Sequence, residues 1–510
     1  MGDIFLKLIT GFEHALSLQN LGFCLMGVFI GTLVGVLPGI GPITAIALLI
    51  PFSFGLEPMT GLIMLTGVYY GSMYGGSTTS ILIRTPGEVA SIITTLDGYE
   101  MAKQGRAGPA LSTAAIGSFI AGTFSIIGLM FLSPIIAKGA YYFGAAEYFL
   151  LMVLSLSMIS SLTTGSVLKG YISTLLGLAI ATVGIDPQSG VNRFTFGNTN
   201  LLDGIDFVLF AIAMFAVPEA LSNMAKKGNE YKTDVQKIQG SLWMTRDDWR
   251  KSIGPYGRGS VLGFLIGALP GIGPSLASFL SYAMERRLSK HPEKFGKGAI
   301  EGVSGPESAN NAGVGGALVP LFTLGIPGSA TTALLLFIFM MYGLQPGPGM
   351  FETNSTLIWA IIASMYIGNV ILLLLNLPLV GVFASILKLP TVPLFVGVLA
   401  FSVIGVYALN FNQFDLFMLL IFGIVGYLMQ QSNIPLAPAV MALVLGPLLE
   451  QNFRRSMSIS NGDLFIFFER PISLALIILI VLVVIVPNIV LLIKKWRQKG
   501  VPPHRLGIRG

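Results

Sequence analysis

Long stretches without a charged residue constrain this chain more than any other feature of its sequence. The run from Ala15 to Leu56 has 42 residues without Asp, Glu, Lys or Arg, and the run from Ser308 to Phe351 has 44. A helix needs about 20 apolar residues to cross a bilayer, so each run has room for two crossings. Shorter uncharged runs cover 58–83, 107–137, 148–168, 170–185, 207–218, 259–284, 353–387, 389–414, 416–449 and 471–493. The pattern predicts an all-α polytopic membrane protein with roughly 10 to 12 passes.

The overall composition supports the same class. Of the 510 residues, 11% are charged and 53% are hydrophobic, whereas soluble proteins carry about 25% charged residues. This composition excludes a cytosolic enzyme and a disordered chain. The net charge of +6 comes from loops and the C-terminus, so we expect the lipid bilayer, and no nucleic acid, as a partner. We expect no cleavable signal peptide, because the N-terminus lacks a basic cluster and a small-residue cleavage site.

Three basic segments predict which parts of the chain face the cytoplasm. Residues 222–258 hold eight Lys or Arg, residues 285–301 hold five, and the C-terminus from Lys494 holds six without an acidic residue. The positive-inside rule places all three in the cytoplasm. We therefore divide the chain into a first transmembrane repeat (1–221), a cytoplasmic basic linker (222–258), a second transmembrane repeat (259–495) and a cytoplasmic basic tail (496–510).

Several kinds of chemistry are disfavoured by what the sequence lacks. Cys24 is the one cysteine and lies in an apolar run, so we expect it to pack rather than to form a disulfide or a cysteine-based metal site. The three histidines lie near the termini or in a charged loop, which argues against a haem or a histidine-built metal centre in the membrane. The chain has no GxxxxGK[ST] pattern, so it does not hydrolyse ATP through a P-loop. An integral membrane enzyme and an uncoupled channel remain alternatives to a coupled transporter.

A hexapeptide occurs twice, nearly half the chain apart. Residues 31–42 read GTLVGVLPGIGP and residues 263–274 read GFLIGALPGIGP, so the offset is 263 − 31 = 232. A weaker match follows each copy, with TPG at 85–87 and IPG at 326–328, at an offset of 241. Two ordered matches at similar offsets predict that the chain arose by duplication and fusion, with two internal repeats that we expect to be inverted.

The repeated motif predicts a break in a helix. Proline removes an amide hydrogen, and glycine favours non-helical backbone, so Pro-Gly-Ile-Gly-Pro cannot continue a straight helix. Residues 259–284 are uncharged and lie between two basic segments, which predicts a re-entrant hairpin with 270–274 at its tip near the bilayer midplane. The first copy has no flanking basic cluster and could enter from the opposite face; a single kinked span is the alternative. Broken helices at corresponding positions of two halves indicate a transporter binding site.

Long motifs of the chain resemble one transporter family. GVLPGIGP, GGSTTSILIRTPGE, GVNRFTFGN, GPESANNAGVGGALVPLFTLGIPGSATTA and LQPGPGM are similar to the large membrane subunit of the tripartite tricarboxylate transporters, the TctA-type permeases, over about residues 15–495. The resemblance implies a bacterial inner-membrane permease for citrate-like or other carboxylates, not an enzyme. It also implies a small membrane subunit and a periplasmic solute-binding protein as partners. It implies no cofactor, and a sodium or proton gradient in place of ATP.

The paired breaks supply the candidate substrate site. A carboxylate in a membrane cavity needs hydrogen-bond donors, and helix N-termini offer free amides with a partial positive charge. Hydroxyl groups near the breaks could bind the substrate or a cation, or they could bond back to their own helices. The alternative for the turns themselves is tight helix packing. The candidate substrate-binding residues are Pro38, Gly39, Gly41, Thr44, Ser77, Thr78, Thr79, Gly271, Gly273, Ser275, Pro327, Gly328, Ser329 and Thr331.

Glu307 is the main candidate for binding a coupling ion. It directly precedes the 44-residue uncharged run, and a carboxylate beside the membrane is costly unless it is paired or functional. We group it with three polar residues as coupling-ion candidates: Glu307, Asn310, Asn311 and Thr323. The alternative is a helix-capping role at the cytoplasmic surface.

The remaining charges in apolar surroundings are weaker candidates. Arg84 could pair with a substrate carboxylate or anchor the chain at the interface. For Glu147 and Lys169 we expect an internal ion pair rather than a substrate site. Arg193 is expected in a loop or gate, or as an interfacial anchor. The dyad Asp247-Asp248 is surrounded by basic residues, which predicts a solvated loop rather than a metal site.

Overall fold

Helices account for nearly all regular structure in the part of the chain that the structure describes. This computed structural model describes residues 2–162, 166–225 and 235–499. The α-helices are α1 (Gly2–Ala15), α2 (Leu18–Val36), α3 (Pro42–Ser53), α4 (Pro58–Ile83), α5 (Thr94–Met101), α6 (Ala107–Ala140), α7 (Ala145–Leu162), α8 (Val167–Ala181), α9 (Phe207–Ala225), α10 (Arg246–Gly267), α11 (Gly273–Leu288), α12 (Glu301–Leu324), α13 (Ala330–Met341), α14 (Met350–Thr353), α15 (Ser355–Asn376), α16 (Val380–Ile386), α17 (Thr391–Asn410), α18 (Gln413–Gln431), α19 (Ala437–Ile459), α20 (Ile466–Glu469) and α21 (Pro471–Lys499). Short helical turns and one antiparallel strand pair complete the described elements: η1 (Val89–Ser91), η2 (Ala102–Arg106), η3 (Thr199–Leu201), η4 (Pro292–Lys294), β1 (Gly184–Ile185) and β2 (Asn192–Arg193). The predicted all-α class is confirmed.

Several of these helices can cross a membrane. Six in the described ranges are long and apolar enough, namely Leu18–Val36, Thr94–Ala140, Phe207–Ala225, Ser355–Asn376, Val392–Asn410 and Gln413–Gln431. Five further apolar helical segments in these ranges have 10 to 17 residues, namely Pro42–Ser53, Ala145–Ser161, Val167–Ala181, Ala330–Met341 and Pro471–Ile485. The chain is therefore a multi-pass membrane protein, while the number of 10 to 12 passes stays a prediction.

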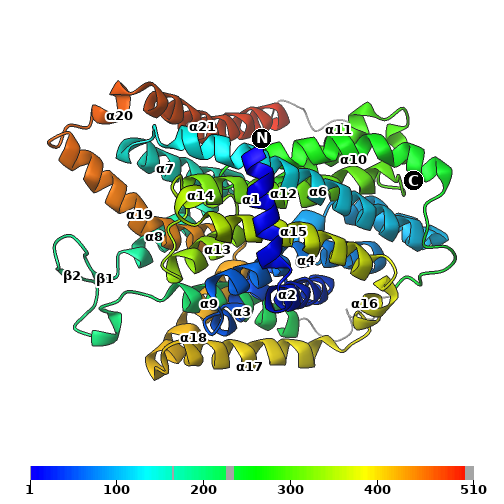
Figure 1. The fold of residues 1–510 in the computed structure, drawn as a ribbon, viewed down its shortest axis with the longest axis horizontal. Helices are drawn as coiled ribbons and strands as arrows, with labels where there is room; N and C mark the ends of the chain where they lie inside the picture. The colour runs from blue at the N-terminus through cyan, green and yellow to red at the C-terminus, as the bar shows by residue number, and fades with distance from the viewer. Residues whose placement is uncertain (1, 163–165, 226–234, 500–510) are drawn as a thin grey trace.

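Helices α4 and α12 form the buried centre of the molecule. Nearly every side chain of both helices is buried, although both carry many Gly, Ser and Thr residues. Helix α4 packs along α2, and α12 packs against α6, α10 and α11. Figure 1 shows α17 along the bottom edge and α21 along the top edge of this arrangement. These outer helices expose large apolar side chains, as helices that face lipid do.

Both LPGIGP motifs break a helix, as predicted. Helices α2 and α3 are separated by residues 37–41, and α10 and α11 by residues 268–272. Gly39 and Gly271 occupy the same position in the two copies and have φ angles of 83° and 80°, which only glycine adopts without strain. Helices α10 and α11 pack against each other, so the second copy is a helical hairpin.

The second pair of breaks also has matching local structure. Helix α4 ends with Arg84 in the left-handed region, and α12 ends with Gly325 in the same region. Four residues after each of these positions, a side chain caps the next helical turn. Glu88 forms a capping box with Ser91 at η1, and Ser329 forms one with Thr332 at α13.

The helix before each LPGIGP break, α2 or α10, packs on a central helix, α4 or α12, through glycines at matching positions. A β-carbon on Gly31 would lie 2.5 Å from the Val68 carbonyl oxygen, and one on Gly263 would lie 2.3 Å from the Ala309 carbonyl oxygen. The first residues of these pairs differ by 232 and the second by 241, which are the offsets of the two sequence motifs. The same relation holds for Gly27 with Met64 and Gly259 with Gly305, and for Gly35 with Ser72 and Gly267 with Gly313.

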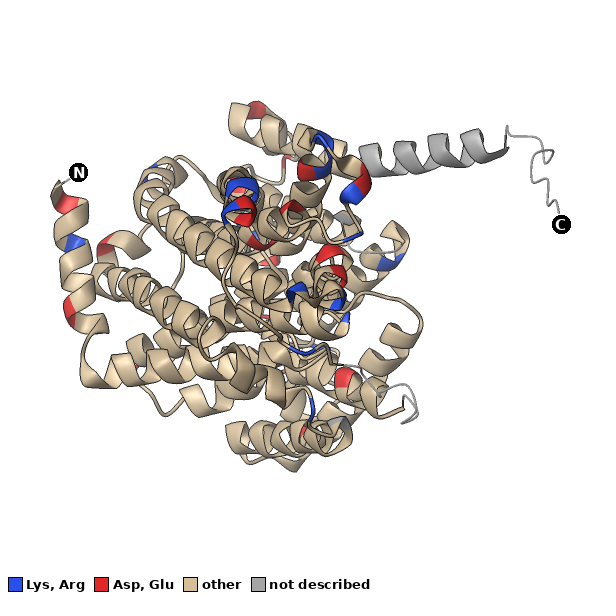
Figure 2. Cartoon of the chain, turned by 90° about the vertical axis from the view of Figure 1, so that its right-hand side faces the viewer, with Lys and Arg blue, Asp and Glu red and all other residues tan. Residues whose placement is uncertain are grey.

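The described parts of the two central basic segments lie at the same end of the molecule. The turn η2 connects them, because Arg106 pairs with Asp248 and Gln104 donates to the Lys297 carbonyl at 2.9 Å. Figure 2 looks onto the right-hand side of Figure 1, and its blue and red segments mark the charged residues seen there. The β1–β2 pair projects at the opposite, left-hand end of Figure 1.

Candidate functional site

Glu307 lies in the buried centre, where three helices meet. Its side chain on the second turn of α12 is 0% exposed. One carboxylate oxygen accepts a hydrogen bond from Ser77 of α4 and the other accepts one from Thr94 of α5. Glu307 therefore joins α12 to both elements of the first half, which a cap at the cytoplasmic surface would not do.

A second buried carboxylate, Glu88, lies beside this cluster. Its side chain is 9% exposed, and it accepts hydrogen bonds from the Ala90 amide at 3.0 Å and from the Asn310 side-chain nitrogen at 3.1 Å. The residue directly follows the Thr-Pro-Gly break at 85–87. The change of chain direction at this break places the Glu88 carboxylate against α12. Glu88 is the last residue of the GGSTTSILIRTPGE motif, but it is not among the residues predicted for the site. An acidic residue directly after Pro-Gly, where the other half has Ser329, was the available signal.

The two carboxylates have no basic counterpart among the described side chains. No ion pair to Glu88 or Glu307 is formed within residues 2–162, 166–225 and 235–499. Burying an uncompensated charge is strongly unfavourable, so such a group is paired, protonated or bound to a cation. The site is thus suited to a positively charged ligand.

Two amide oxygens next to the carboxylates lack hydrogen-bond partners. The Asn311 nitrogen donates to Ser118 at 2.7 Å and to the Glu307 carbonyl at 3.2 Å, and both asparagines are fully buried. In the described structure the Oδ1 atoms of Asn310 and Asn311 are buried without a partner. An unsatisfied buried acceptor costs about 1–3 kcal/mol. Both oxygens are therefore free to accept from, or coordinate, a ligand.

A small cavity adjoins this cluster. It lies between α4, α6 and α15 and is lined by Tyr74, Ser77, Thr78, Leu111, Ala114, Ala115, Ser118 and Asn376. Ser77 binds Glu307 and Ser118 binds Asn311, so two lining hydroxyls touch the polar cluster directly. Of the predicted residues, Ser77 and Thr78 face this space.

The corresponding region at the second break is built from hydroxyl groups. The Tyr69 hydroxyl of α4 lies 3.4 Å from the Ser329 hydroxyl at the start of α13. A β-carbon on Gly273, at the start of α11, would lie 3.0 Å from the Ser329 β-carbon. The N-termini of α11 and α13 therefore lie next to each other, with Tyr69 against the start of α13, and no carboxylate takes part in these contacts.

The predicted substrate residues fall into these two regions. Around the first break, Thr79 donates to the Val36 carbonyl at 2.6 Å, Gly41 faces Glu88, and Gly39 lies against Glu219 of α9. Gly273, Gly328 and Ser329 lie around the second break. Thr323 does not join Glu307, because it lies 16 residues further along α12, about 24 Å away, and donates to the Val319 carbonyl of its own helix. Pro38, Thr44, Gly271, Ser275, Pro327 and Thr331 lie on the turns or the first turns of the following helices.

A comparison with known protein families decides the assignment. The model of the family described as "Tripartite tricarboxylate transporter TctA family" matches residues 21–441. The chain belongs to this family. The resemblance inferred from the motifs is confirmed. The buried site therefore lies in a tricarboxylate transporter subunit.

Two relatives from Agrobacterium vitis are similar to this TctA family member. One, named "Uncharacterized 52.8 kDa protein in TAR-I ttuC' 3'region", is 47% identical over 477 residues, which cover 94% of this chain and 95% of the relative. The other, named "Uncharacterized protein in TAR-II ttuC' 3'region", is 45% identical over 230 residues, covering 44% of this chain and 95% of the relative. No solved structure matches the chain.

The weaker charged candidates of this TctA family member have structural partners. Glu147 is buried and pairs with Arg470 at 2.8 Å, so the expected internal ion pair is present, but not with Lys169. Lys169 instead donates to the Ser432 carbonyl at 2.5 Å. Arg84 is exposed and lies over the Tyr99 ring, away from the buried cluster.

The acidic dyad corrects one sequence expectation. Asp247 is exposed and pairs with Lys251, but Asp248 is 3% exposed. Asp248 forms a capping box with Thr245 at the start of α10 and pairs with Arg106. It is therefore a buried helix cap and not part of a solvated loop, because the Arg106 guanidinium compensates its charge.

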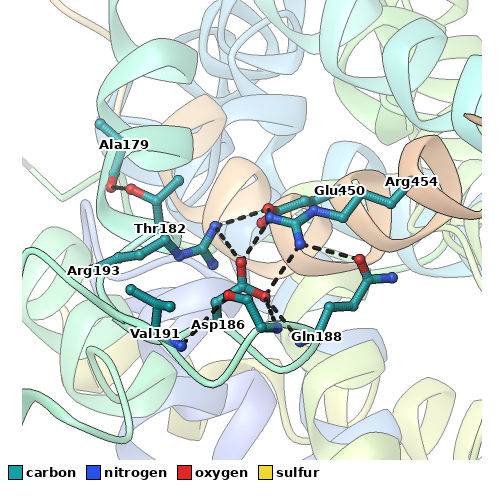
Figure 3. A network of polar contacts seen from close by, with 9 residues as sticks. Ala179, Thr182, Asp186, Gln188, Val191, Arg193, Glu450 and Arg454 are labelled. Carbon is teal, nitrogen blue, oxygen red and sulfur yellow. Dashed lines mark hydrogen bonds and ion pairs between the residues drawn. The ribbon is translucent and has the colours of Figure 1, made fainter. Parts of the chain in front are cut away.

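Arg193 belongs to an ion-pair network at the far end of the molecule (Figure 3). It pairs with Glu450 of α19 at 2.8 Å, and Arg454 pairs with both Glu450 and Asp186. The Gln188 backbone amide and the Arg454 guanidinium hold the pKa of Asp186 well below its usual range. The network ties the β1–β2 pair to α19. Arg193 lies in strand β2 rather than in a loop, and its ion pairs are with Asp186 and Glu450, not with the buried cluster.

Asp97 is a buried carboxylate that sequence reasoning missed. Its Oδ1 accepts from the backbone amides of Gly296, Gly298 and Ala299 at 2.8–2.9 Å, and its Oδ2 accepts from the Tyr282 hydroxyl at 2.8 Å. It lies three residues after Thr94, the residue that donates to Glu307. Asp97 thus fixes α5 to the loop before α12.

Proposed function

We propose that the chain is the secondary-active permease subunit of a binding-protein-dependent carboxylate uptake system. Tricarboxylates such as citrate are the substrate class, and symport with sodium or protons drives uptake. The observation that carries the proposal is the buried cluster of Glu88, Glu307 and Asn310 between broken helices, in a member of a transporter family. A group of buried acids without basic partners in the described chain fits a cation that enters and leaves during transport.

Two crossed contacts support a two-fold relation between the halves. Asn310 donates to Glu88, and Tyr69 contacts Ser329. Since 69 + 241 = 310 and 88 + 241 = 329, the same pair of positions meets twice, once in each direction. Contacts of this reciprocal kind are typical of a two-fold axis. Because only the second hairpin is flanked by basic segments, we place the axis in the membrane plane, which makes the repeats inverted.

The substrate carboxylates are assigned to the hydroxyl-lined region. The N-termini of α11 and α13 offer backbone amides and partial positive charge to an anion. Tyr69 and Ser329 add hydroxyl donors, and the buried acids lie at the other break. The two glycine turns bring these helix ends together, which is why the broken helices matter for binding.

The partners and topology follow the family. We propose a small membrane subunit and a periplasmic solute-binding protein as partners, and the bacterial inner membrane as the location. The segments 222–258 and 285–301 and the C-terminus face the cytoplasm. The solute-binding protein would then set much of the choice of carboxylate.

Uptake by reconstituted vesicles tests this function. A panel of labelled carboxylates is offered with both partner proteins present or one omitted, under a sodium gradient, a proton gradient or neither. We expect uptake of a tricarboxylate that needs both partners and one of the gradients. Uptake that is independent of any gradient would indicate an uncoupled channel, and conversion of the carboxylate to another compound would indicate an enzyme.

A further inference from the structure

Among the described residues, the acidic cluster forms at only one of the two breaks, from Glu88 of the first half and Glu307 and Asn310 of the second. At the offset of 241, Glu88 corresponds to Ser329, Asn310 to Tyr69, and Glu307 to Thr66, since 307 − 66 = 241. These positions make equivalent contacts at the two breaks, as the crossed pairs Glu88–Asn310 and Ser329–Tyr69 demonstrate. Carboxylates and amides at one break are thus replaced by hydroxyls at the other.

We propose that Glu88, Glu307 and the Asn310 amide oxygen form a single sodium-binding site in this chain. The assignment rests on the proposed symport function and specifies it further, because it names sodium, adds Glu88 as a ligand and sets one cation per chain. The hydroxyl cluster at the second break binds no cation.

The geometry around Asn310 supports this site. Its Nδ2 donates to Glu88 Oε1 at 3.1 Å, and its Oδ1 is fully buried and unpartnered. The nitrogen and oxygen of one amide share a carbon, so the free oxygen lies close to the Glu88 carboxylate. Asn310 and Glu307 are three residues apart on α12 and therefore lie on one face of the helix.

The donor set favours a small hard cation. Carboxylate and amide oxygens bind hard ions such as sodium, magnesium and calcium, whereas softer metals prefer nitrogen or sulfur. Within the described ranges, no group of three or more Asp, Glu, His or Cys side chains lies close enough to hold a metal ion. A site made of protein oxygens suits sodium better than magnesium, because magnesium keeps several of its waters and is seldom held by protein ligands alone, and better than calcium, which takes about six to eight oxygen ligands.

Hydroxyl and amide donors of the first half orient the two carboxylates. Ser77 and Thr94 each donate to Glu307, and the Ala90 amide donates to Glu88 at 3.0 Å. These donors hold the carboxylates in place while leaving their charge uncompensated by any described basic side chain. A cation would bring α4, α12 and the segment before η1 together.

Thermal unfolding of the purified full chain in detergent tests the site directly. The midpoint is measured at rising sodium chloride, with choline chloride keeping the ionic strength constant. A ligand that binds the folded state raises the midpoint in a saturable way, so we expect sodium to do so for the native chain. Glu88→Gln should raise the sodium concentration at half effect by about ten- to a hundredfold, because one charged ligand is lost.

Two further variants, and the number of sodium ions bound per chain, complete the test. Glu147→Gln is the matched control, since it removes a buried carboxylate that has its own partner, Arg470; it should keep the sodium response even if its basal midpoint falls. Glu88→Asp keeps the charge and should bind sodium better than Glu88→Gln. Binding of labelled sodium should reach one ion per chain.

Several outcomes would overturn the site. These are a native chain that responds equally to sodium and choline, a response to magnesium or calcium alone, an unchanged sodium curve for Glu88→Gln, or two ions per chain. The measurement uses neither substrate nor partner proteins. A failure here therefore leaves carboxylate uptake open, and sodium binding without coupled uptake would contradict the proposed function but not the site.

Discussion

At the scale of single residues, the centre of this protein is a set of buried polar groups that depend on one another. Glu307 takes hydrogen bonds from two helices of the first half, and Asn311 bonds both to Ser118 and to the Glu307 backbone. Such a network is stable only when each charge has a ligand or a proton. Substitutions in this network should therefore change either ligand affinity or the stability of the fold.

Asn310→Ala and Asn311→Ala should weaken ligand binding without unfolding the chain. Each change removes a free amide oxygen beside the carboxylates, and Asn310→Ala also removes the donor to Glu88. Loss of a hydrogen bond to a charged group costs about 1.5–3 kcal/mol, so the half-saturating concentration of ion or substrate should rise about ten- to a hundredfold. Uptake kinetics at normal membrane levels of the protein measure this. Unchanged half-saturation for both variants would exclude the asparagines from the site.

Asp97→Asn should lower stability rather than change ion or substrate affinity. The neutral amide accepts more weakly from the three backbone amides and the Tyr282 hydroxyl, so we expect a loss of about 1.5–3 kcal/mol and a lower midpoint of thermal unfolding. Asp247→Asn, at an exposed ion pair, is the control and should leave the midpoint nearly unchanged. Equal midpoints for the two variants would contradict the role of Asp97.

At the scale of elements, the two broken helices place the ends of α3, α11 and α13 near the buried clusters. Gly39 and Gly271 need the left-handed conformation. Gly41, in the same turn, has φ −75°, and its β-carbon position is 3.8 Å from the nearest neighbouring atom. Gly39, and not Gly41, is therefore the glycine of the first turn that cannot be replaced.

Gly39→Val and Gly271→Val should each abolish uptake while the protein still reaches the membrane. A β-branched residue is strained at positive φ, and a β-carbon at these sites would lie 2.0 Å from Glu219 Oε1 or 2.5 Å from the Ser155 carbonyl oxygen. Gly139→Val, where a β-carbon meets nothing within 4 Å, is the control. Normal uptake by either turn variant would mean that the turn serves only packing.

At the scale of the whole molecule, the topology separates the charged end from the β1–β2 loop. Helix α9 is long and apolar enough to cross the membrane, and it lies between this loop and segment 222–258. Residues 226–234 of that segment lie outside the described ranges. Lys290 in the second basic segment is therefore the better position to label. We expect Lys290 to face the cytoplasm and Thr199 to face the periplasm.

Single-cysteine labelling in a Cys24→Ser background measures this topology. A reagent that cannot cross the membrane should label Thr199→Cys from the periplasmic side, and should reach Lys290→Cys only after the membrane is opened. Periplasmic labelling of Lys290→Cys would contradict both the topology and the re-entrant α10–α11 hairpin.

Local chemistry made part of this structure predictable from the sequence. Hydropathy was enough for the helical class, and the positions of proline and glycine were enough for the two breaks, because both properties act within a few residues. The site was only partly predictable. Glu307, Asn310 and Ser77 were chosen, but Glu88 and Asp97 were not, because their partners are 222 and up to 202 residues away in the chain.

Uptake against ion concentration, for the native chain and for Glu307→Gln, tests the central claim that ion coupling runs through the buried acids. The assay uses vesicles with both partner proteins and compares sodium and proton gradients at equal membrane levels of the two proteins. We expect gradient-driven uptake by the native chain. For Glu307→Gln we expect an ion dependence weakened more than substrate recognition, with a half-saturating ion concentration about ten- to a hundredfold higher. An unaltered ion curve for Glu307→Gln, or uptake by the native chain without any gradient, would contradict the account.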